Sequence, residues 1–272
     1  MNATELRRLL DAHGIKPSRA LGQNFLIDTN TAQRIVRLAG IEAGDDVLEV
    51  GPGVGALTLA LTDAGARVRA VEVDRHLLPV LNEVTAGRAV EVVHADAMQV
   101  DWSELLSDHA RWTMVSNLPY NVATPVVIRA LETAPAIAHF LVMVQREVGE
   151  RIAARVGDPQ YGAVSVKVAY YANAEVVGSV GRTVFSPRPN VDSALVRLDR
   201  RGAPPVDVAD EARLFELVRA GFATRRKTLR NALGGVLGAD AAARLEEAGI
   251  DPRARAETLE LAQWAALTAV AP

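Results

Sequence analysis

Residues 115–125, "VSNLPYNVATP", contain the residue types from which a pocket for a flat base can be built. A short apolar stretch ends at Asn117, whose amide oxygen can accept hydrogen bonds from an amino group. Pro119 fixes its own φ and stiffens the turn, and Tyr120 offers an aromatic face on which a base can stack. A plain strand end needs none of these side chains, so we predict a base pocket here. A simple turn with a core tyrosine is the structural alternative.

The surrounding elements must place this segment at the edge of a sheet. Short apolar runs alternate with helical segments over the first half of the chain, which predicts a parallel sheet covered by helices on both faces. The expected strands are 46–50, 68–74, 89–96, 112–117 and 139–145.

After Arg155 this alternation ends. Residues 163–172, 174–180 and 193–199 are strand-like and suggest a hairpin or an antiparallel edge added to the sheet. Residues 199–210 are rich in Pro, Gly and charge, which is typical of a linker, and the chain beyond them is helical in pattern.

Ligands of parallel α/β sheets bind beyond the carboxyl ends of the strands. The first strand is followed by Gly51, Gly53 and Gly55, which permit close backbone approach. Their G-x-G-x-G spacing differs from the G-x-G-x-x-G of dinucleotide sites. The spacing of the glycines argues against NAD, which is the main alternative ligand for such a cleft. It favours a ligand with a carboxylate and an adenosine. Glu72, Asp96 and Asn117 end the next three strands.

Composition narrows the class of protein. The chain has 272 residues and no cysteine, which excludes disulfides, thiolate zinc sites and a cysteine nucleophile. No apolar run has the length of a membrane span, and the first residues lack the apolar core of a secretion signal. We therefore expect a soluble cytoplasmic protein.

The charge is unevenly distributed. The net charge is −3, with 12 Lys+Arg against 17 Asp+Glu in residues 1–136 and 15 against 10 in residues 140–231. The two parts are therefore expected to have different roles.

Several motifs together resemble those of class I S-adenosylmethionine-dependent methyltransferases. More narrowly, they resemble the ribosomal RNA adenine N6-dimethyltransferases of the KsgA type, which are relatives of the Erm resistance methylases. The resemblance extends from about Leu21 to at least Leu233, and its motifs are "LGQNFL", "LEVGPGVGALT", "VEVDRHL", "HADAM", "SNLPYNVATP", "MVQREVGER", "YGAVSV", "VFSPRPNVDSA" and "FATRRKTLRNAL". Gly181 departs from the pattern, since the family usually has Pro there, and this puts the stiffness of that loop in doubt.

The resemblance implies an α/β fold, namely a Rossmann-like, mostly parallel seven-stranded sheet with helices on both faces, plus a small all-α C-terminal domain. It places the methyltransferase domain at residues 1–203, with residues 1–27 covering the cofactor, and a helical RNA-binding domain at 204–272. It also implies S-adenosyl-L-methionine as cofactor, S-adenosyl-L-homocysteine as product, and no metal. The implied cofactor-binding residues are Asn24, Leu26, Gly51, Gly53, Glu72, Val73, Asp96, Ala97 and Asn117.

Within such an enzyme, the segment 117–120 has a chemical role. The amino group of adenine is a poor nucleophile, so acceptors aimed at its two protons would position it and favour a tetrahedral nitrogen. The Asn117 oxygen is one acceptor, and the carbonyl of Leu118 or Pro119 is the second, with Pro119 favoured by the resemblance. Tyr120 would stack on the base, and Phe185 resembles the second aromatic, which closes the other face.

The basic residues imply an RNA surface. Arg225, Arg226, Lys227 and Arg230 are expected close together on a helix, and a solvated helix face is the alternative. With Arg146, Arg151, Arg155 and Arg188 they suggest a track for phosphates. The resemblance implies 16S ribosomal RNA as partner, at two adjacent adenosines of its 3′-terminal hairpin loop in the assembling 30S subunit, and a monomeric enzyme.

Four other functions compete with this one. A DNA adenine methyltransferase commonly carries a shorter Asp/Asn-Pro-Pro-Tyr/Phe motif and a separate recognition domain. An Erm-type enzyme would act on 23S ribosomal RNA, and substrate RNA alone separates it from the KsgA type. A cytosine C5 methyltransferase is excluded because it needs a cysteine. An rRNA-binding assembly factor with secondary or lost activity remains, although the cofactor and Asn-Leu-Pro-Tyr residues are all present.

Overall fold

The structure is a computed structural model that describes residues 1–18, 21–224 and 226–271, and in it the chain forms two compact units. The first unit comprises residues 1–150 and 174–200, and the second comprises residues 151–173 and 201–272. Residues 151–173 therefore pack with the C-terminal helices, whereas the sequence grouped them with residues 1–203. The division of roles at residue 203 stays a prediction.

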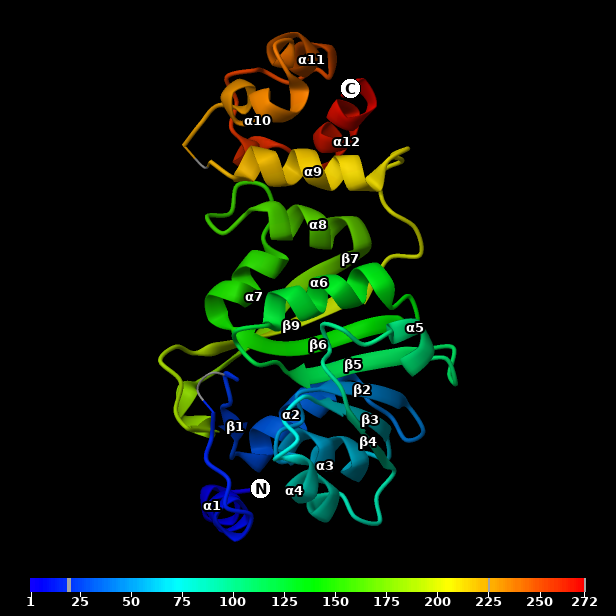
Figure 1. Cartoon of the computed structure of the whole chain (residues 1–272), viewed down its shortest axis with the longest axis vertical. Coiled ribbons are helices and arrows are strands. Elements are labelled where there is room, and N and C mark those ends of the chain that lie inside the picture. The colour runs from blue at the N-terminus through cyan, green and yellow to red at the C-terminus, as the bar shows by residue number, and fades with distance from the viewer. Residues whose placement is uncertain (19–20, 225, 272) are drawn as a thin grey trace. The chain divides into compact units, whose positions relative to one another are not determined.

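The first unit is built on the expected sheet (Figure 1). Its strand order is β4-β3-β2-β5-β6-β9-β7, with β2 to β6 parallel and β9 antiparallel to β6. Val47 and Leu48 in β2 are both 0% exposed, as expected for a parallel strand covered on both faces. The strands are β2 Asp46–Val50, β3 Arg67–Glu72, β4 Val90–His94, β5 Trp112–Asn117, β6 Ile137–Gln145, β7 Ala172–Val180 and β9 Ser193–Arg200.

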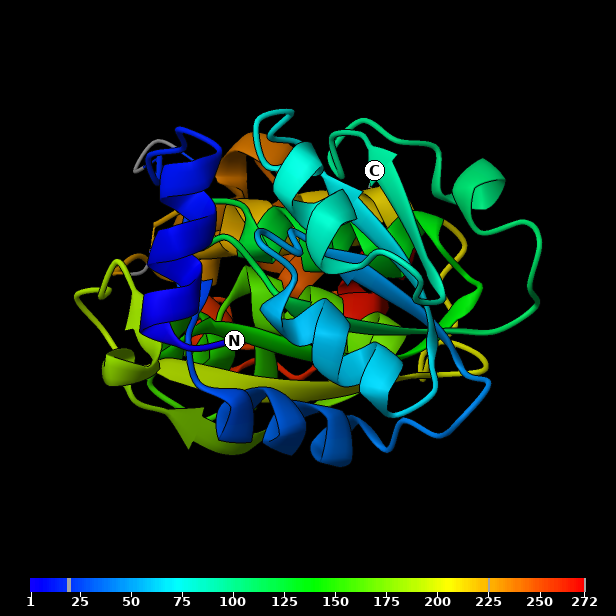
Figure 2. The ribbon, with the colours of Figure 1, turned by 90° about the horizontal axis from the view of Figure 1, so that it is seen from below.

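Helices cover this sheet. The helices α2 (Thr29–Ala39) and α3 (Ala56–Asp63) lie side by side (Figure 2) and bury Ile35 and Leu61 against strand residues such as Val115. Helix α6 (Ala123–Thr133) packs on β6. Pro79 lies in the first turn of its helix. The other helices of this part are α4 Leu78–Val84, α5 Trp102–Leu105 and α7 Arg146–Ala153.

The N-terminal segment is fastened to the first unit at two places. Helix α1 (Ala3–Ala12) begins at the N-cap Asn2 and packs its apolar face, with Leu6, against Phe25. Strand β1 (Phe25–Leu26) pairs antiparallel with β8 (Phe185–Ser186), which follows the short helix η1 (Arg182–Val184). The segment before the core and the "FSPRP" motif are therefore one local structure.

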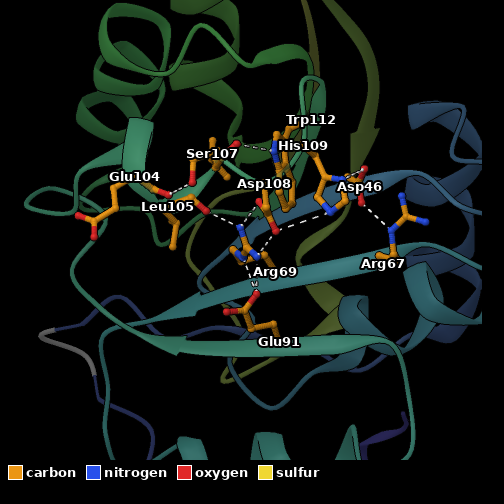
Figure 3. A network of polar contacts seen from close by, with 11 residues as sticks. Asp46, Arg67, Arg69, Glu91, Glu104, Leu105, Ser107, Asp108, His109 and Trp112 are labelled. Carbon is orange, nitrogen blue, oxygen red and sulfur yellow. Dashed lines mark hydrogen bonds and ion pairs between the residues drawn. The ribbon is translucent and has the colours of Figure 1, made fainter.

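An ionic network holds the amino-terminal ends of the strands (Figure 3). Arg69 donates two hydrogen bonds to Asp108, at 2.9 and 2.7 Å, and a third to Glu91 at 2.7 Å. Its guanidinium lies 4.9 Å from the ring centre of Trp112, the first residue of β5. The bond from Arg69 lowers the pKa of Asp108 to about 2. The network thus fixes the loop 106–111 at the start of β5, the strand that ends in Asn117.

The second unit corrects one predicted element. Residues 163–172 alternate in a strand-like pattern, yet Ala163–Tyr171 form helix α8. The Ser165 hydroxyl accepts a hydrogen bond from the Gly162 N–H and donates one to the Arg151 carbonyl. Val166 and Tyr170 enter the core of the helical unit beside Trp264. Tertiary packing therefore overrides the β propensity of the valines.

The second unit also corrects the expected single helix around residues 225–230. Helix α9 ends at Phe222 and α10 begins after the N-cap Thr228, so Arg226 and Lys227 lie in the turn between two helices and only Arg230 is helical. Arg225 lies outside the described residues. The helices are α9 Glu211–Phe222, α10 Leu229–Leu237, α11 Ala241–Glu247, η2 Ala256–Thr258 and α12 Leu261–Val270.

Within the described ranges, no helix combines the length and the apolar character that crossing a bilayer requires.

Candidate active site

A cavity lies at the carboxyl ends of β2, β3 and β5, within the first unit, and the N-terminal segment 21–26 forms part of its wall. The cavity brings together every residue that the sequence assigned to the cofactor, and Leu118, Pro119 and Tyr120 as well. The assigned cofactor residues in its lining are Asn24, Leu26, Gly51, Gly53, Glu72, Val73, Asp96, Ala97 and Asn117.

The glycine loop is held between two other walls of the cavity. Gly51 has a φ of +70°, and a Cβ there would meet the Pro119 ring at 3.1 Å. Gly53 has a φ of +60°, and a Cβ there would meet the ring of Phe25 at 3.0 Å. Both positions therefore require glycine for conformation and for space. The loop packs between Pro119 and the N-terminal segment.

Two buried carboxyl groups lie beside the glycine loop. Glu72 is 5% exposed and accepts hydrogen bonds from the N–H groups of Gly53, at 3.1 Å, and Asp74, at 2.9 Å. Burial raises its pKa. Glu49 is 1% exposed, accepts a bond from the Thr58 hydroxyl at 2.6 Å, and has its pKa raised by burial to about 8. Glu49 is therefore a neutral acid at pH 7, and Glu72 presents its remaining lone pairs to the cavity.

Asp96 has a local structural role in addition to its place in the lining. Its carboxylate accepts the N–H of Met98 at 2.8 Å and the side-chain amide of Gln99 at 2.9 Å. These bonds fix the turn after β4 and leave the neighbouring Ala97 buried at 7% exposure against the cavity.

The Asn117 amide is oriented by the N-terminal segment. Its Nδ2 donates to the backbone carbonyl of Asn24 at 3.3 Å. The amide nitrogen is thereby engaged, and the acceptor oxygen Oδ1 is left for another donor. Asn24, in the N-terminal segment of the cavity wall, thus sets the direction in which the Asn117 oxygen points.

The two carbonyls that follow Asn117 differ in their bonding. The Pro119 carbonyl accepts the N–H of Val122 at 3.1 Å in a turn. No described residue donates to the carbonyl of Leu118, whose own N–H binds Met143 and whose side chain is 1% exposed. Leu118 is therefore anchored on β6 while its carbonyl stays available.

The two aromatic residues lie in different surroundings. Tyr120 lines the cavity and is partly buried, and its hydroxyl lies 2.7 Å from the Ser193 hydroxyl. Phe185 is 3% exposed, packs in the core with Leu26 and is absent from the cavity lining. The structure therefore brings Tyr120 to the cavity and places Phe185 beneath it, and a stacking role for Phe185 stays a prediction.

The predicted RNA-binding residues are divided between the two units. Arg146 and Arg188 are exposed residues of the first unit, and Arg151 belongs to the second. Arg226, Lys227 and Arg230 are exposed in the second unit. The described residues contain no cluster of three or more His, Asp or Glu side chains that could hold a metal ion.

No role was assigned from the sequence to three residues near the cavity, although Glu49 stands with the glycines at the end of the first strand. Gln23 donates to Asp74 at 2.8 Å, Ser193 contacts Tyr120, and the buried Glu49 lines the wall. All three stand inside quoted motifs, "LGQNFL", "NVDSA" and "LEVGPG", so their presence in those motifs was the available signal.

Comparisons with known proteins show the family to which the chain belongs. "Ribosomal RNA small subunit methyltransferase A" of Thermobifida fusca is 49% identical over 97% of this chain and 94% of that protein, and the protein of the same name from Geobacillus thermodenitrificans is 43% identical over 96% and 93%. The crystal structure of the 23S rRNA methyltransferase ErmE has a TM-score of 0.68 and 30% identity, covering 91% of this chain and 99% of that one. A dimethyladenosine transferase from Plasmodium falciparum shares the fold with a TM-score of 0.74 at 23% identity, covering 89% and 95%.

The fold is therefore that of a class I methyltransferase. The chain belongs to the ribosomal RNA adenine dimethylase family, whose model matches residues 15–271. It is an rRNA adenine dimethyltransferase, and its cofactor is S-adenosyl-L-methionine. The residues present fit that group, because the cavity lies at the strand ends beside the glycine loop and Glu72 lines it with a carboxyl group that can accept from hydroxyl groups.

Proposed function

We propose that this protein methylates N6 of two adjacent adenosines in the 3′-terminal hairpin loop of small-subunit ribosomal RNA, giving N6,N6-dimethyladenosine. It does so as a monomer in the cytoplasm, on the assembling 30S particle. The choice of subunit is supported by relatives named for the small subunit at 43–49% identity, against 30% for the 23S rRNA enzyme ErmE. The observation that carries the chemistry is the oriented amide of Asn117 between the cofactor residues and Tyr120.

Different residues of the cavity would bind different parts of the cofactor. Gly51 and Gly53 would pass beneath it, Glu72 would accept from the ribose hydroxyls, and Asp96 with Ala97 would hold the adenine end. Asn24 and Leu26 would cover the methionine end, and Val73 lies in the cavity wall next to Glu72 in sequence. When bound, the cofactor supplies a methyl carbon activated by a sulfonium.

The acceptors for the target amine are the Asn117 oxygen and a main-chain carbonyl. Leu118 is the better second acceptor, because Pro119 already accepts the N–H of Val122. Two acceptors aimed at the two amine protons hold the nitrogen in line with the methyl carbon and favour a tetrahedral geometry. The nitrogen would take the methyl group from the sulfonium, leaving S-adenosyl-L-homocysteine, and would then lose a proton to solvent. After the first transfer one proton remains, so the second transfer uses one acceptor.

Tyr120 receives the extruded base. Removing a base from its stack costs a few kcal/mol, and stacking on an aromatic ring returns roughly 1–3 kcal/mol. Tyr120 is partly buried and lines the same cavity as Asn117 and Leu118. Phe185 would need to leave its buried position in order to close the other face.

The helical second unit is the proposed RNA-binding part. Arg226 and Lys227 are exposed in the turn between α9 and α10, and no ion pair engages either of them within the described chain. Exposed, uncompensated cations bind phosphates without sequence preference. Arg146 and Arg188 of the first unit and Arg151 and Arg230 of the second are the further proposed contacts, with Arg225, which lies outside the described residues.

Incubation with labelled S-adenosyl-L-methionine and unmodified 30S subunits, followed by nucleoside analysis, tests the proposal. Dimethyladenosine at the 3′-terminal hairpin is the expected product. Parallel reactions with 50S subunits test the Erm-type alternative. Label in 23S ribosomal RNA alone would contradict the choice of subunit, and tight binding to 30S without any transfer would indicate an assembly factor.

A further inference from the structure

We propose that Ser193 is a positioning residue for the target base: its hydroxyl holds the phenol of Tyr120 and so fixes the position of the ring on which the base stacks. The proposal rests on the proposed function of Tyr120, and it deepens that function by naming what sets the position of the stacking surface.

The contact joins a loop residue to the sheet. The Tyr120 and Ser193 hydroxyl oxygens are 2.7 Å apart, across 73 residues of sequence. Ser193 is 0% exposed and is the first residue of β9, where it pairs with Gln145 at the end of β6. Tyr120 lies in the loop after β5 and lines the cavity. The far end of the phenol is therefore anchored on a paired strand, whereas its Cα belongs to a loop.

The residue before Ser193 is itself fixed on both sides. The Asp192 backbone carbonyl accepts the N–H of Arg146 at 3.0 Å, and its carboxylate accepts the N–H of Arg182 at 3.1 Å. The Arg182 guanidinium in turn donates to the Asn190 carbonyl at 3.2 Å. Ser193 is thus held by the β6–β9 ladder and by its preceding loop. A hydroxyl that is fixed in this way can hold another group in place.

This anchor matters because the first side-chain torsion of a tyrosine can adopt several staggered values, which point the ring in different directions. A tyrosine attached only at its Cα can exchange among these directions, and a bond at the para oxygen, the far end of the ring axis, holds one of them. Misplacement of a reacting group by a small distance is costly when catalysis depends on orientation. The Tyr120–Ser193 bond therefore converts a flexible aromatic side chain into a fixed stacking surface.

Ser193 acts through Tyr120 and does not touch the reaction. It is fully buried and is not part of the cavity lining. Its loss is therefore expected to lower the rate of methyl transfer while leaving the affinity for the cofactor unchanged, since Ser193 does not line the cavity. A residue with a merely structural role would instead lower stability and affect each of these properties.

A double-mutant cycle tests the proposal, with Ser193→Ala, Tyr120→Phe and the double variant compared in single-turnover reactions at saturating cofactor. Each single variant is expected to lower the rate about three- to tenfold, the range that one lost hydrogen bond produces. The double variant is expected to be no slower than either single one, because both remove the same bond. Ser193→Thr, which keeps the hydroxyl, is expected to retain the wild-type rate. Wild-type rates in Ser193→Ala, or losses that multiply in the double variant, would overturn the proposal.

A second measurement is independent of activity and of the substrate. The chain has 4 tyrosines, so NMR of the protein labelled on tyrosine rings allows the Tyr120 signal to be assigned by its loss in Tyr120→Phe. Ser193→Ala is expected to shift and average the Tyr120 ring signals and to leave the other tyrosines unchanged. Unchanged Tyr120 signals would contradict the anchor, even if the enzyme methylates an RNA other than the one proposed. Absence of transfer to 30S subunits would instead contradict the proposed function alone.

Discussion

The amide of Asn117 has two ends with different tasks. Its nitrogen is bound to the Asn24 carbonyl at 3.3 Å, and its oxygen is the proposed acceptor for the target amine. Because an amide presents a donor and an acceptor in one plane, fixing one end directs the other. The Asn117 side chain thus links the N-terminal segment 21–26 to the proposed binding of the target amine.

Replacement of Asn117 by Ala tests this role. Loss of the acceptor is expected to lower the single-turnover rate at least about 100-fold, as for other preorganised donors and acceptors at a reacting centre. The affinity for the cofactor, measured by calorimetry, is expected to change by less than about threefold, because Glu72 and the glycine loop are untouched. Asn82→Ala, at an exposed position of α4, is the control. Substantial turnover of Asn117→Ala would remove Asn117 from the mechanism.

The raised pKa of Glu49 predicts how the stability of the folded protein depends on pH. Burial raises its pKa from 4.5 to about 8, so the folded protein binds this proton more tightly than the unfolded chain. Stability associated with Glu49 is therefore full below pH 4.5 and falls as the pH rises towards 8. In Glu49→Gln this fall is removed, and the variant is expected to gain on the order of 5 °C in Tm relative to wild type between pH 5 and pH 9.

Thermal unfolding across pH measures this difference. Glu42→Gln, at an exposed carboxyl group next to the same strand, is the control and is expected to follow the wild-type profile. Parallel curves for Glu49→Gln and wild type from pH 5 to pH 9 would show that Glu49 is ionised in the folded protein.

At the scale of the elements, Gln23 holds the N-terminal segment 21–26, which forms the cover of the cavity. Its side-chain nitrogen donates to Asp74 at 2.8 Å, and its side-chain oxygen accepts the N–H of Ser18 at 2.7 Å. Gln23→Glu keeps the second bond and replaces the first by repulsion between two carboxylates. Cofactor dissociation, followed by stopped-flow displacement, is expected to become about three- to tenfold faster. Gln33→Glu on the exposed face of α2 is the control, and equal dissociation rates would show that Gln23 does not hold the cover closed.

The loop after β7 allows a test of the departure at Gly181. Its φ of −71° is the angle that proline adopts, and an added Cβ there meets nothing within 4 Å. Gly181→Pro is therefore expected to stabilise the folded state by about 0.4–1 kcal/mol, because proline restricts the unfolded chain. Gly157→Pro is the opposite control. Gly157 has a φ of +96°, which proline cannot adopt, so this variant is expected to destabilise the folded state. Denaturant unfolding measures both, and a loss of stability in Gly181→Pro would show that this loop needs a glycine.

How much the sequence revealed differs between elements. The five parallel strands and the strand-end residues followed from apolar runs and their termini, because a buried parallel strand leaves a strong local signal. Helix α8 did not, since its alternating valines have β propensity and its helical state depends on the core around Trp264. The Ser193–Tyr120 contact spans 73 residues, and no local pattern shows such a pairing.

At the scale of the whole molecule, the residues proposed for methyl transfer and those proposed for RNA binding lie in parts of the chain with opposite net charge. The acidic part of the chain, residues 1–136, holds the glycine loop and Asn117, and the basic part, residues 140–231, ends in the turn with Arg226 and Lys227. Exposed cations attract phosphates to the basic part of the chain. Substrate affinity and methyl transfer should therefore be separable by mutation.

Charge reversal at Arg226 tests this separation. Arg226→Glu is expected to weaken binding to ribosomal RNA and to reduce the slope of log affinity against log salt by about 0.7–0.9 for each phosphate contact that is lost. Filter binding over a salt series measures the slope, and cofactor affinity, measured alongside, is expected to stay at the wild-type value. Arg253→Glu reverses one charge on a side chain of the same unit that is 89% exposed, and it serves as the matched control. If both reversals change the slope equally, the turn between α9 and α10 has no special role, and RNA binding reflects the overall charge of the unit.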